Sequence, residues 1–110
     1  MYHANVTREE FCKMVDHALL RQCNPIEMLD QFCDDTVKYG FGSLCIFPCD
    51  VAYAKKRMGD RGEVCAVIGY PMGANTTETK VFEALQAIDD GAKELDFVMN
   101  ISRFMDGDDE

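Results

Sequence analysis

The sequence predicts an α/β fold, in which helices and strands alternate along a single domain of 110 residues. Two observations lead to this prediction. Strong helix-start patterns recur along the chain, and short apolar runs without polar alternation lie between the helical segments. Successive apolar runs are separated by about 20 to 30 residues, a spacing typical of βα units joined by right-handed crossovers.

The predicted helices begin at three segments whose side chains can satisfy the free N–H groups of a first turn. Residues 7–10 (TREE) form a capping box, in which the threonine oxygen accepts from the third amide and the glutamate reaches back. Residues 24–27 (NPIE) combine Asn24 as the N-cap with Pro25 at the first helical position. Residues 75–78 (NTTE) repeat that pattern. We therefore expect a helix to start at each segment.

Two of these helices keep apolar side chains at helical spacing until a glycine. One pattern runs from Ile26 to Val37 before Gly40, and the other runs from Val81 to Ile88 before Gly91. Each helix is expected to bury one face. A further short helix is compatible with residues 50–58.

Four short segments are predicted to be strands. Residues 43–48 (SLCIFP), 64–70 (VCAVIGY) and 94–100 (ELDFVMN) suit strands covered on both faces, as in parallel sheets flanked by helices. Residues 15–20 form a weaker fourth candidate. A (β/α)8 barrel typically needs about 250 residues, whereas a small doubly wound sheet could be completed within this length. The residue patterns alone leave both architectures open.

Composition and charge exclude several classes of function. The chain is 47% hydrophobic and 28% charged, as in ordinary globular proteins. Its formal net charge is −9 and the sequence shows no basic patch, so nucleic acid and anionic membranes are not expected partners. No apolar stretch approaches the roughly 18 to 20 residues that span a bilayer, so a soluble protein is expected.

The six cysteines do not predict a disulfide framework. No signal peptide precedes them, and no C-x-x-C pair supplies metal-ligand spacing. Cys33, Cys45 and Cys65 lie within apolar patterns, where cysteine behaves as a small hydrophobic residue. A reduced, cytoplasmic location is therefore expected.

Candidate functional residues lie on the predicted strands, because ligands of parallel α/β domains gather beyond the carboxyl ends of the strands. Asp96 stands within the apolar run LDFVM, where we expect it to be buried and where an unpaired carboxylate would be costly. It is interpreted either as a general acid/base or partner of a catalytic cation, or as a structural ion pair or loop cap.

Other residues near the strands also allow two interpretations. Asp16 and His17 belong either to the first strand or to the exposed end of the first helix. Cys45 is either a packed core residue or a nucleophile, which would need a lowered pKa and access to solvent. Residues 69–73 (GYPMG) are interpreted either as a turn after a strand, where glycine permits a positive φ, or as a substrate loop.

Four segments resemble deoxyribose-phosphate aldolases, in family order and with family spacing. They are residues 16–20 (DHALL), 39–48 (YGFGSLCIFP), 67–84 (VIGYPMGANTTETKVFEA) and 91–100 (GAKELDFVMN). Together they cover almost the whole chain, and the third segment is long enough to be specific.

This resemblance implies a (β/α)8 TIM barrel, of which residues 1–110 would form the N-terminal half with its first four βα units. It also implies a class I aldolase that needs no cofactor and no metal. Such an enzyme reversibly cleaves 2-deoxyribose 5-phosphate into glyceraldehyde 3-phosphate and acetaldehyde through a lysine Schiff base. The catalytic carboxylate of the family's proton relay falls on Asp96, and Asp16 and Cys45 match positions near the substrate pocket.

The chain departs from the family pattern in two respects. Ala18 replaces the threonine usual after the aspartate–histidine pair, which removes a hydroxyl from the pocket wall. The family's Schiff-base lysine lies on the sixth strand, a second relay lysine on the seventh, and the phosphate site near the last two, all expected beyond Glu110. The six lysines of this chain fall in or beside predicted helices, so we expect it to be inactive by itself.

Three interpretations of the chain remain open. It is the leading half of an aldolase that acts with a complementary half, or a stand-alone half-barrel that serves as a binding or assembly module, or a small rearranged sheet with a vestigial pocket. Four βα units leave two sheet edges and an apolar interior uncovered, so self-association or pairing with a complementary half-barrel is expected.

Overall fold

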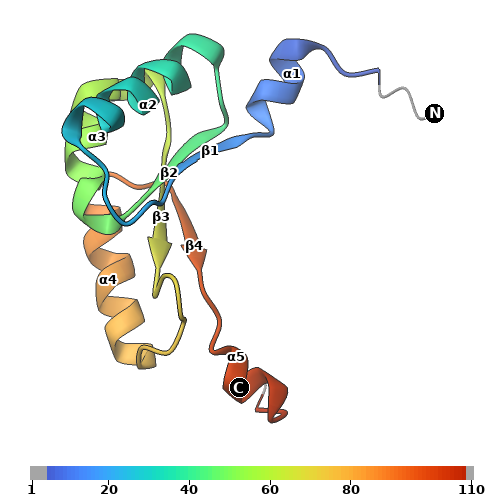
Figure 1. Cartoon of the computed structure of the whole chain (residues 1–110), viewed down its shortest axis with the longest axis vertical. Coiled ribbons are helices and arrows are strands. Elements are labelled where there is room, and N and C mark those ends of the chain that lie inside the picture. Colours follow the sequence, from blue (N-terminus) through green and yellow to red (C-terminus); the bar gives the residue numbers. More distant parts are fainter. Residues whose placement is uncertain (1–4, 109–110) are drawn as a thin grey trace.

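The computed structural model describes residues 5–108, in which four strands alternate with helices (Figure 1). The elements are α1 (Arg8–Lys13), β1 (Asp16–Leu19), α2 (Ile26–Tyr39), β2 (Ser43–Ile46), α3 (Val51–Met58), β3 (Val64–Ile68), α4 (Thr77–Asp89), β4 (Glu94–Phe97) and α5 (Ile101–Met105). Short 3₁₀ turns, Pro48–Asp50 and Gly59–Arg61, flank α3. All four predicted strands are present, and the predicted α/β class is confirmed.

The four strands form one sheet in the order β1-β2-β3-β4, and each strand runs parallel to its neighbours. The register pairs Ala18 with Cys45, Cys45 with Cys65, and Val67 with Asp96. Figure 1 shows α2, α3 and α4 on the same side of this sheet. Because all strands are parallel, their carboxyl ends lie along one edge, which is where ligands of such sheets bind.

The core lies between the sheet and these three helices. The strands contribute Leu19, Leu44, Ile46, Val64, Ala66 and Ile68, and the helices contribute Leu29, Cys33, Val51, Ala54, Met58, Ala84 and Ala87. Branched and aliphatic side chains on alternate strand positions therefore face the helices. The buried face predicted for α4 is wrong in most positions, because Val81, Leu85 and Ile88 are exposed and only Ala84 and Ala87 are buried. In α2 the prediction holds at Leu29 and Cys33, whereas Ile26 is exposed.

The prediction that the apolar runs are covered on both faces is confirmed for two strands and wrong for one. Every residue of β2 and β3 is buried, whereas three of the four residues of β4 are exposed. The reason is position in the sheet. A strand at the edge has a neighbour on one side only, and β4 is such a strand.

The helix starts differ from the predictions at two of three places. The capping box before α1 is confirmed, with Thr7 Oγ1 accepting from the Glu10 amide at 3.1 Å. At α2 the N-cap is Pro25, with ψ of 151°, and Asn24 instead donates to the Arg21 carbonyl at 2.9 Å. At α4 the N-cap is Thr76, one residue later than expected, because its hydroxyl accepts from the Thr79 amide.

Within residues 5–108, no helix combines the length and the apolar character that crossing a membrane requires.

The core assignment predicts how two chemically identical truncations differ. Ile46→Ala removes a fully buried side chain from β2 and is expected to lower the free energy of unfolding by about 2 to 5 kcal/mol. Ile26→Ala, at the 48% exposed first residue of α2, should change it by no more than about 0.5 kcal/mol. Urea denaturation followed by circular dichroism measures both. Equal losses for the two variants would contradict this core.

Candidate functional site

The side of the sheet that faces away from the helices carries the candidate site. Successive strand residues point to opposite faces, so the register places one set of side chains on this side, which we call the open face. It consists of Asp16, Ala18, Ser43, Cys45, Cys65, Val67, Glu94 and Asp96. A small apolar cluster of Cys45, Cys65 and Val67 lies at its centre, with Leu20 and Phe47 packed against it.

The structure brings the three predicted site residues onto this one face without placing them in contact. Asp16 lies at the amino end of β1, Cys45 lies one level higher on β2, and Asp96 lies one further level up on β4. Asp16 and Asp96 are separated by three strand spacings of about 4.8 Å each. The face therefore presents two carboxylates on its outer strands with a thiol between them.

Asp16 is held by a residue that the sequence analysis did not single out. The buried Ser43 hydroxyl donates to Asp16 Oδ1 at 2.8 Å, across the first two strands. The signal was present in the sequence, because Ser43 stands two residues before Cys45 and so shares its face once residues 43–46 form a strand. This bond fixes the carboxylate at the amino end of the face.

The expectation that Asp96 is buried is wrong. Its side chain is exposed, since β4 is an edge strand and nothing among the described residues covers it from the open face. Within residues 5–108 it makes no side-chain hydrogen bond and no ion pair, so the structural interpretation as a salt bridge or loop cap gains no support from this part of the chain. Asp96 is a free carboxylate on the open face.

Cys45 combines features of both interpretations given to it. It is 4% exposed and packs beside Cys65, which is its register partner on β3 and is 3% exposed. The neighbouring Cys65 thiol lowers the pKa of the Cys45 thiol, and this effect outweighs burial and the nearby carboxylates, which act in the opposite direction. The same pairing raises the pKa of Cys65. Cys45 is thus a core residue whose pKa is lowered by its neighbour Cys65.

His17 belongs to β1, as one interpretation had it, but it faces away from Asp16. Its ring stacks on Phe32 of α2 with centroids 4.3 Å apart and leans on Phe41 at 4.9 Å. Burial lowers the pKa of His17, against a smaller opposing effect of Asp35. Its Nε2 is buried without a hydrogen-bond partner in the described structure. His17 therefore lies outside the open face.

The loop after β3 is fixed by α4 and by the end of β4. The Gly69 amide donates to Glu83 Oε1 at 2.8 Å, and the Lys80 ammonium donates to the Val98 carbonyl at 2.8 Å. Gly73 has a φ of 66°, and a Cβ there would overlap the Met99 carbonyl oxygen. Residues 69–73 are thereby held beside the carboxyl ends of β3 and β4. No pattern in the sequence indicates the roles of Glu83 and Lys80.

Two pockets flank the carboxyl edge of the sheet. One, of about 420 Å³, adjoins the open face at the ends of β2 and β3. Its lining is Phe47, Pro48, Cys49, Val67, Tyr70 and Glu83. The rings of Phe47 and Tyr70 meet edge to face at 5.6 Å within it. This pocket extends the apolar part of the open face toward the loop.

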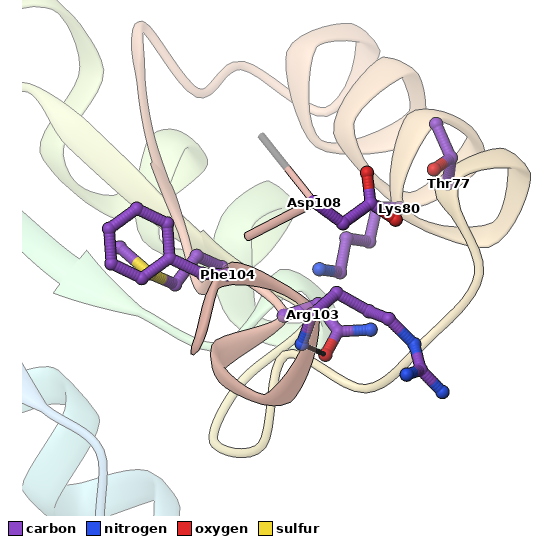
Figure 2. A pocket seen from close by; sticks show the side chains of 7 residues that line it. Thr77, Lys80, Arg103, Phe104 and Asp108 are labelled. Atoms are coloured by element: carbon purple, nitrogen blue, oxygen red, sulfur yellow. Dashed lines mark hydrogen bonds between the residues drawn. The ribbon is translucent and has the colours of Figure 1, made fainter. Parts of the chain in front are cut away.

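The other pocket, of about 380 Å³, lies between α4 and α5 (Figure 2). Its lining is Thr77, Lys80, Met99, Asn100, Arg103, Phe104 and Asp108, and none of the predicted site residues is among them. Its two cations are already engaged, since Lys80 bonds to the Val98 carbonyl and Arg103 pairs with Asp106 at 2.9 Å. In the part of the chain that the structure describes, no group of three or more metal-ligating side chains occurs.

Comparison with known proteins finds close relatives along most of the chain. A deoxyribose-phosphate aldolase from Thermoanaerobacter sp. (strain X514) is 48% identical over 98 residues, which are 87% of this chain and 44% of that protein. One from Staphylococcus haemolyticus (strain JCSC1435) is 45% identical over 98 residues, again covering 44% of that protein. The chain therefore spans less than half the length of these relatives. No family model matches it.

Solved structures give the same result for the fold. A putative deoxyribose-phosphate aldolase from Coccidioides immitis superimposes with a TM-score of 0.87 at 30% identity, over 94% of this chain and 42% of that one. An aldolase called QR15 gives 0.82 at 35% identity, over 87% of this chain and 43% of that one. A deoxyribose phosphate aldolase from Aeropyrum pernix, described as tetrameric, gives 0.79 at 27% identity, over 87% and 42%.

The setting of His17 predicts a pH dependence of stability. Because burial lowers its pKa below the ordinary 6.5, the unfolded chain takes up the proton first as pH falls, and stability is lost below about pH 6.5. NMR titration should give a His17 pKa under 6.5. His17→Phe keeps an aromatic ring between Phe32 and Phe41 and should lose less unfolding free energy than the unaltered chain between about pH 7.5 and about pH 5. A His17 pKa at or above 6.5 would contradict this.

Proposed function

The chain belongs to the deoxyribose-phosphate aldolase family, and on that basis we propose that it forms the N-terminal half of a class I aldolase site that cleaves 2-deoxyribose 5-phosphate. The predicted half-barrel is confirmed, since four parallel βα units match less than half of each barrel relative. One observation supports the proposal most strongly. The three positions that the family resemblance selects, Asp16, Cys45 and Asp96, lie together on the one sheet face that the helices leave uncovered.

In this proposal Asp96 is the catalytic carboxylate of the site. It moves the proton during carbinolamine breakdown and enamine protonation, a general acid/base role that contributes about 10² to 10⁴ in rate. Its position supports the role, because Asp96 is exposed and free of partners on the edge strand of the described sheet. A neighbouring strand paired to β4 would place its side chains beside this carboxylate.

Asp16, Cys45 and the apolar cluster form one wall of the proposed substrate pocket. Asp16 is oriented by Ser43, and Val67 and Phe47 lead from the centre of the open face into the pocket of about 420 Å³. Ala18 leaves a small methyl group where the family resemblance implies a hydroxyl. This wall is therefore expected to contact substrate mainly through apolar atoms.

The Schiff-base lysine in this proposal comes from polypeptide outside this chain. The six lysines lie off the four strands, at Lys13, Lys38, Lys55, Lys56, Lys80 and Lys93. Three of them are also bound elsewhere, since Lys80 is bonded to the Val98 carbonyl, Lys55 to the Gly59 carbonyl and Lys93 to Glu63. None is placed on the open face, where an amine would have to meet the aldehyde.

Reconstitution tests the proposed function. The chain is mixed with the remaining C-terminal part of the Thermoanaerobacter relative, and cleavage of 2-deoxyribose 5-phosphate is followed by the release of acetaldehyde. We expect the mixture to be active and the chain alone to be inactive, with borohydride and acetaldehyde attaching no ethyl group to its lysines. Turnover by the chain alone would contradict the assignment of the lysine.

The role of Asp96 is tested in the same mixture. Asp96→Asn removes the proton-transferring group and is expected to lower kcat by about 10² to 10⁴. Glu94→Gln, a matched change two residues earlier on the same strand, should lower it less than about tenfold. Equal losses in both variants would remove Asp96 from the proposed role.

A second candidate function, as an assembly module, is favoured by the exposed apolar side chains of α4. Val81, Phe82 and Leu85 are exposed on this helix, and Phe82 is 73% exposed. Edge strands β1 and β4 also offer unpaired backbone groups. Two copies related by a two-fold axis could pair β4 of each with β1 of the other and close an eight-stranded sheet.

Self-association is therefore expected for the isolated chain. Sedimentation velocity over a concentration series should show a concentration-dependent dimer or larger species. Phe82→Glu puts a charge on the exposed face of α4 and should weaken association, whereas Ala52→Glu, at an exposed position of α3, should leave it unchanged. A chain that stays monomeric at all concentrations would argue against the assembly role.

A further inference from the structure

Cys45 and Cys65 form a pair of thiols at the centre of the open face. They are register partners on the parallel strands β2 and β3, so their side chains leave the sheet on the same side. Neighbouring strands are about 4.8 Å apart, which falls within the roughly 4.4 to 6.8 Å between Cα atoms that a disulfide bridges. Both thiols are buried and belong to the same small apolar cluster. The pair thus has the proximity that an intrachain bridge needs.

The other cysteines lack one or another of these properties. Cys33 is buried in the helix-covered core, and burial raises its pKa to about 11, which keeps it as a thiol. Cys23 and Cys49 are exposed, and Cys12 is buried on α1. The adjacent Cys65 thiol lowers the pKa of Cys45, which favours the thiolate that reacts with electrophiles.

We propose that Cys45 and Cys65 are a modification site, at which a hydroperoxide converts the two thiols into a disulfide that links β2 to β3. In the first step the Cys45 thiolate attacks the peroxide O–O bond, which breaks to give Cys45 sulfenic acid and one molecule of water or alcohol. In the second step the Cys65 sulfur attacks the Cys45 sulfur and expels the hydroxyl as water. Two thiols are oxidised by two electrons, and the peroxide is reduced by the same two.

The modification goes beyond the proposed aldolase role and does not depend on it. It would fix the central wall of the open face, because the bridge joins the two buried middle strands of the sheet. The disulfide also removes the free thiol at Cys45. The test follows the mass of the peroxide-treated chain and needs no turnover of sugar phosphate. It can therefore fail or succeed independently of the aldolase proposal.

Peroxide treatment of the folded chain tests the site directly. In a Cys23→Ser/Cys49→Ser variant the two exposed thiols are absent, and hydrogen peroxide should remove two hydrogen masses per chain, restored by dithiothreitol. Trypsin then releases residues 39–55, carrying Cys45, and residues 62–80, carrying Cys65. We expect these two peptides to be joined.

Variants of the pair and of the core identify the thiols involved. Cys65→Ser should abolish the two-hydrogen loss and leave a sulfenic acid on Cys45, which a dimedone probe labels. Cys33→Ser should leave the joined peptides unchanged. In urea the chain is unfolded, and peroxide should then produce a mixture of disulfides in which Cys45 and Cys65 are also linked to Cys12 and Cys33.

Two results would overturn the proposal. One is that both thiols of the folded chain remain alkylatable by iodoacetamide after unfolding, at peroxide doses that fully oxidise Cys49 in the unaltered chain. The other is that Cys65→Ser still loses two hydrogen masses. The first measurement requires no substitution at Cys45 or Cys65, so a folding defect in a variant cannot obscure it.

Discussion

The register of the four parallel strands is the constraint on which both the core and the candidate site depend. A strand shifted by one residue would exchange its two faces. In the observed register Leu44, Ile46 and Val64 point to the helices, and Cys45 and Asp96 point to the open face. The free energy of burying the aliphatic side chains therefore also determines which side the candidate site occupies.

The same register explains the electrostatic character of the open face. Asp16, Glu94 and Asp96 are all on it, and no lysine or arginine stands on any of the four strands. The only polar partner supplied to these carboxylates from the described sheet is the hydroxyl of Ser43. Carboxylates without cations are complementary to positively charged groups.

The inner and outer strands differ in burial, because an inner strand has a neighbouring strand on both sides and an edge strand has one on a single side. β2 and β3 are buried throughout and carry the paired thiols, whereas β1 and β4 carry the carboxylates, with two of four residues exposed in β1 and three of four in β4. Helix α4 makes two hydrogen bonds to the segments that follow β3 and β4. Glu83 of α4 accepts from the Gly69 amide at the start of the loop after β3, and Lys80 of the same helix donates to the Val98 carbonyl just after β4.

The sequence by itself determined the alternation of helices and strands as far as β4 and the parallel class of the sheet, because capping residues, helical spacing and apolar runs are local signals. Its resemblance to known aldolases indicated the family. The sequence also selected Asp16, Cys45 and Asp96 from their places on predicted strands, and the family resemblance then chose between the two interpretations of each. Only the tertiary structure decided that Asp96 is exposed, that Ser43 holds Asp16, and that Cys65 lies beside Cys45. These facts depend on which strands are neighbours and which are edges, and that order is set by packing between segments far apart in the chain.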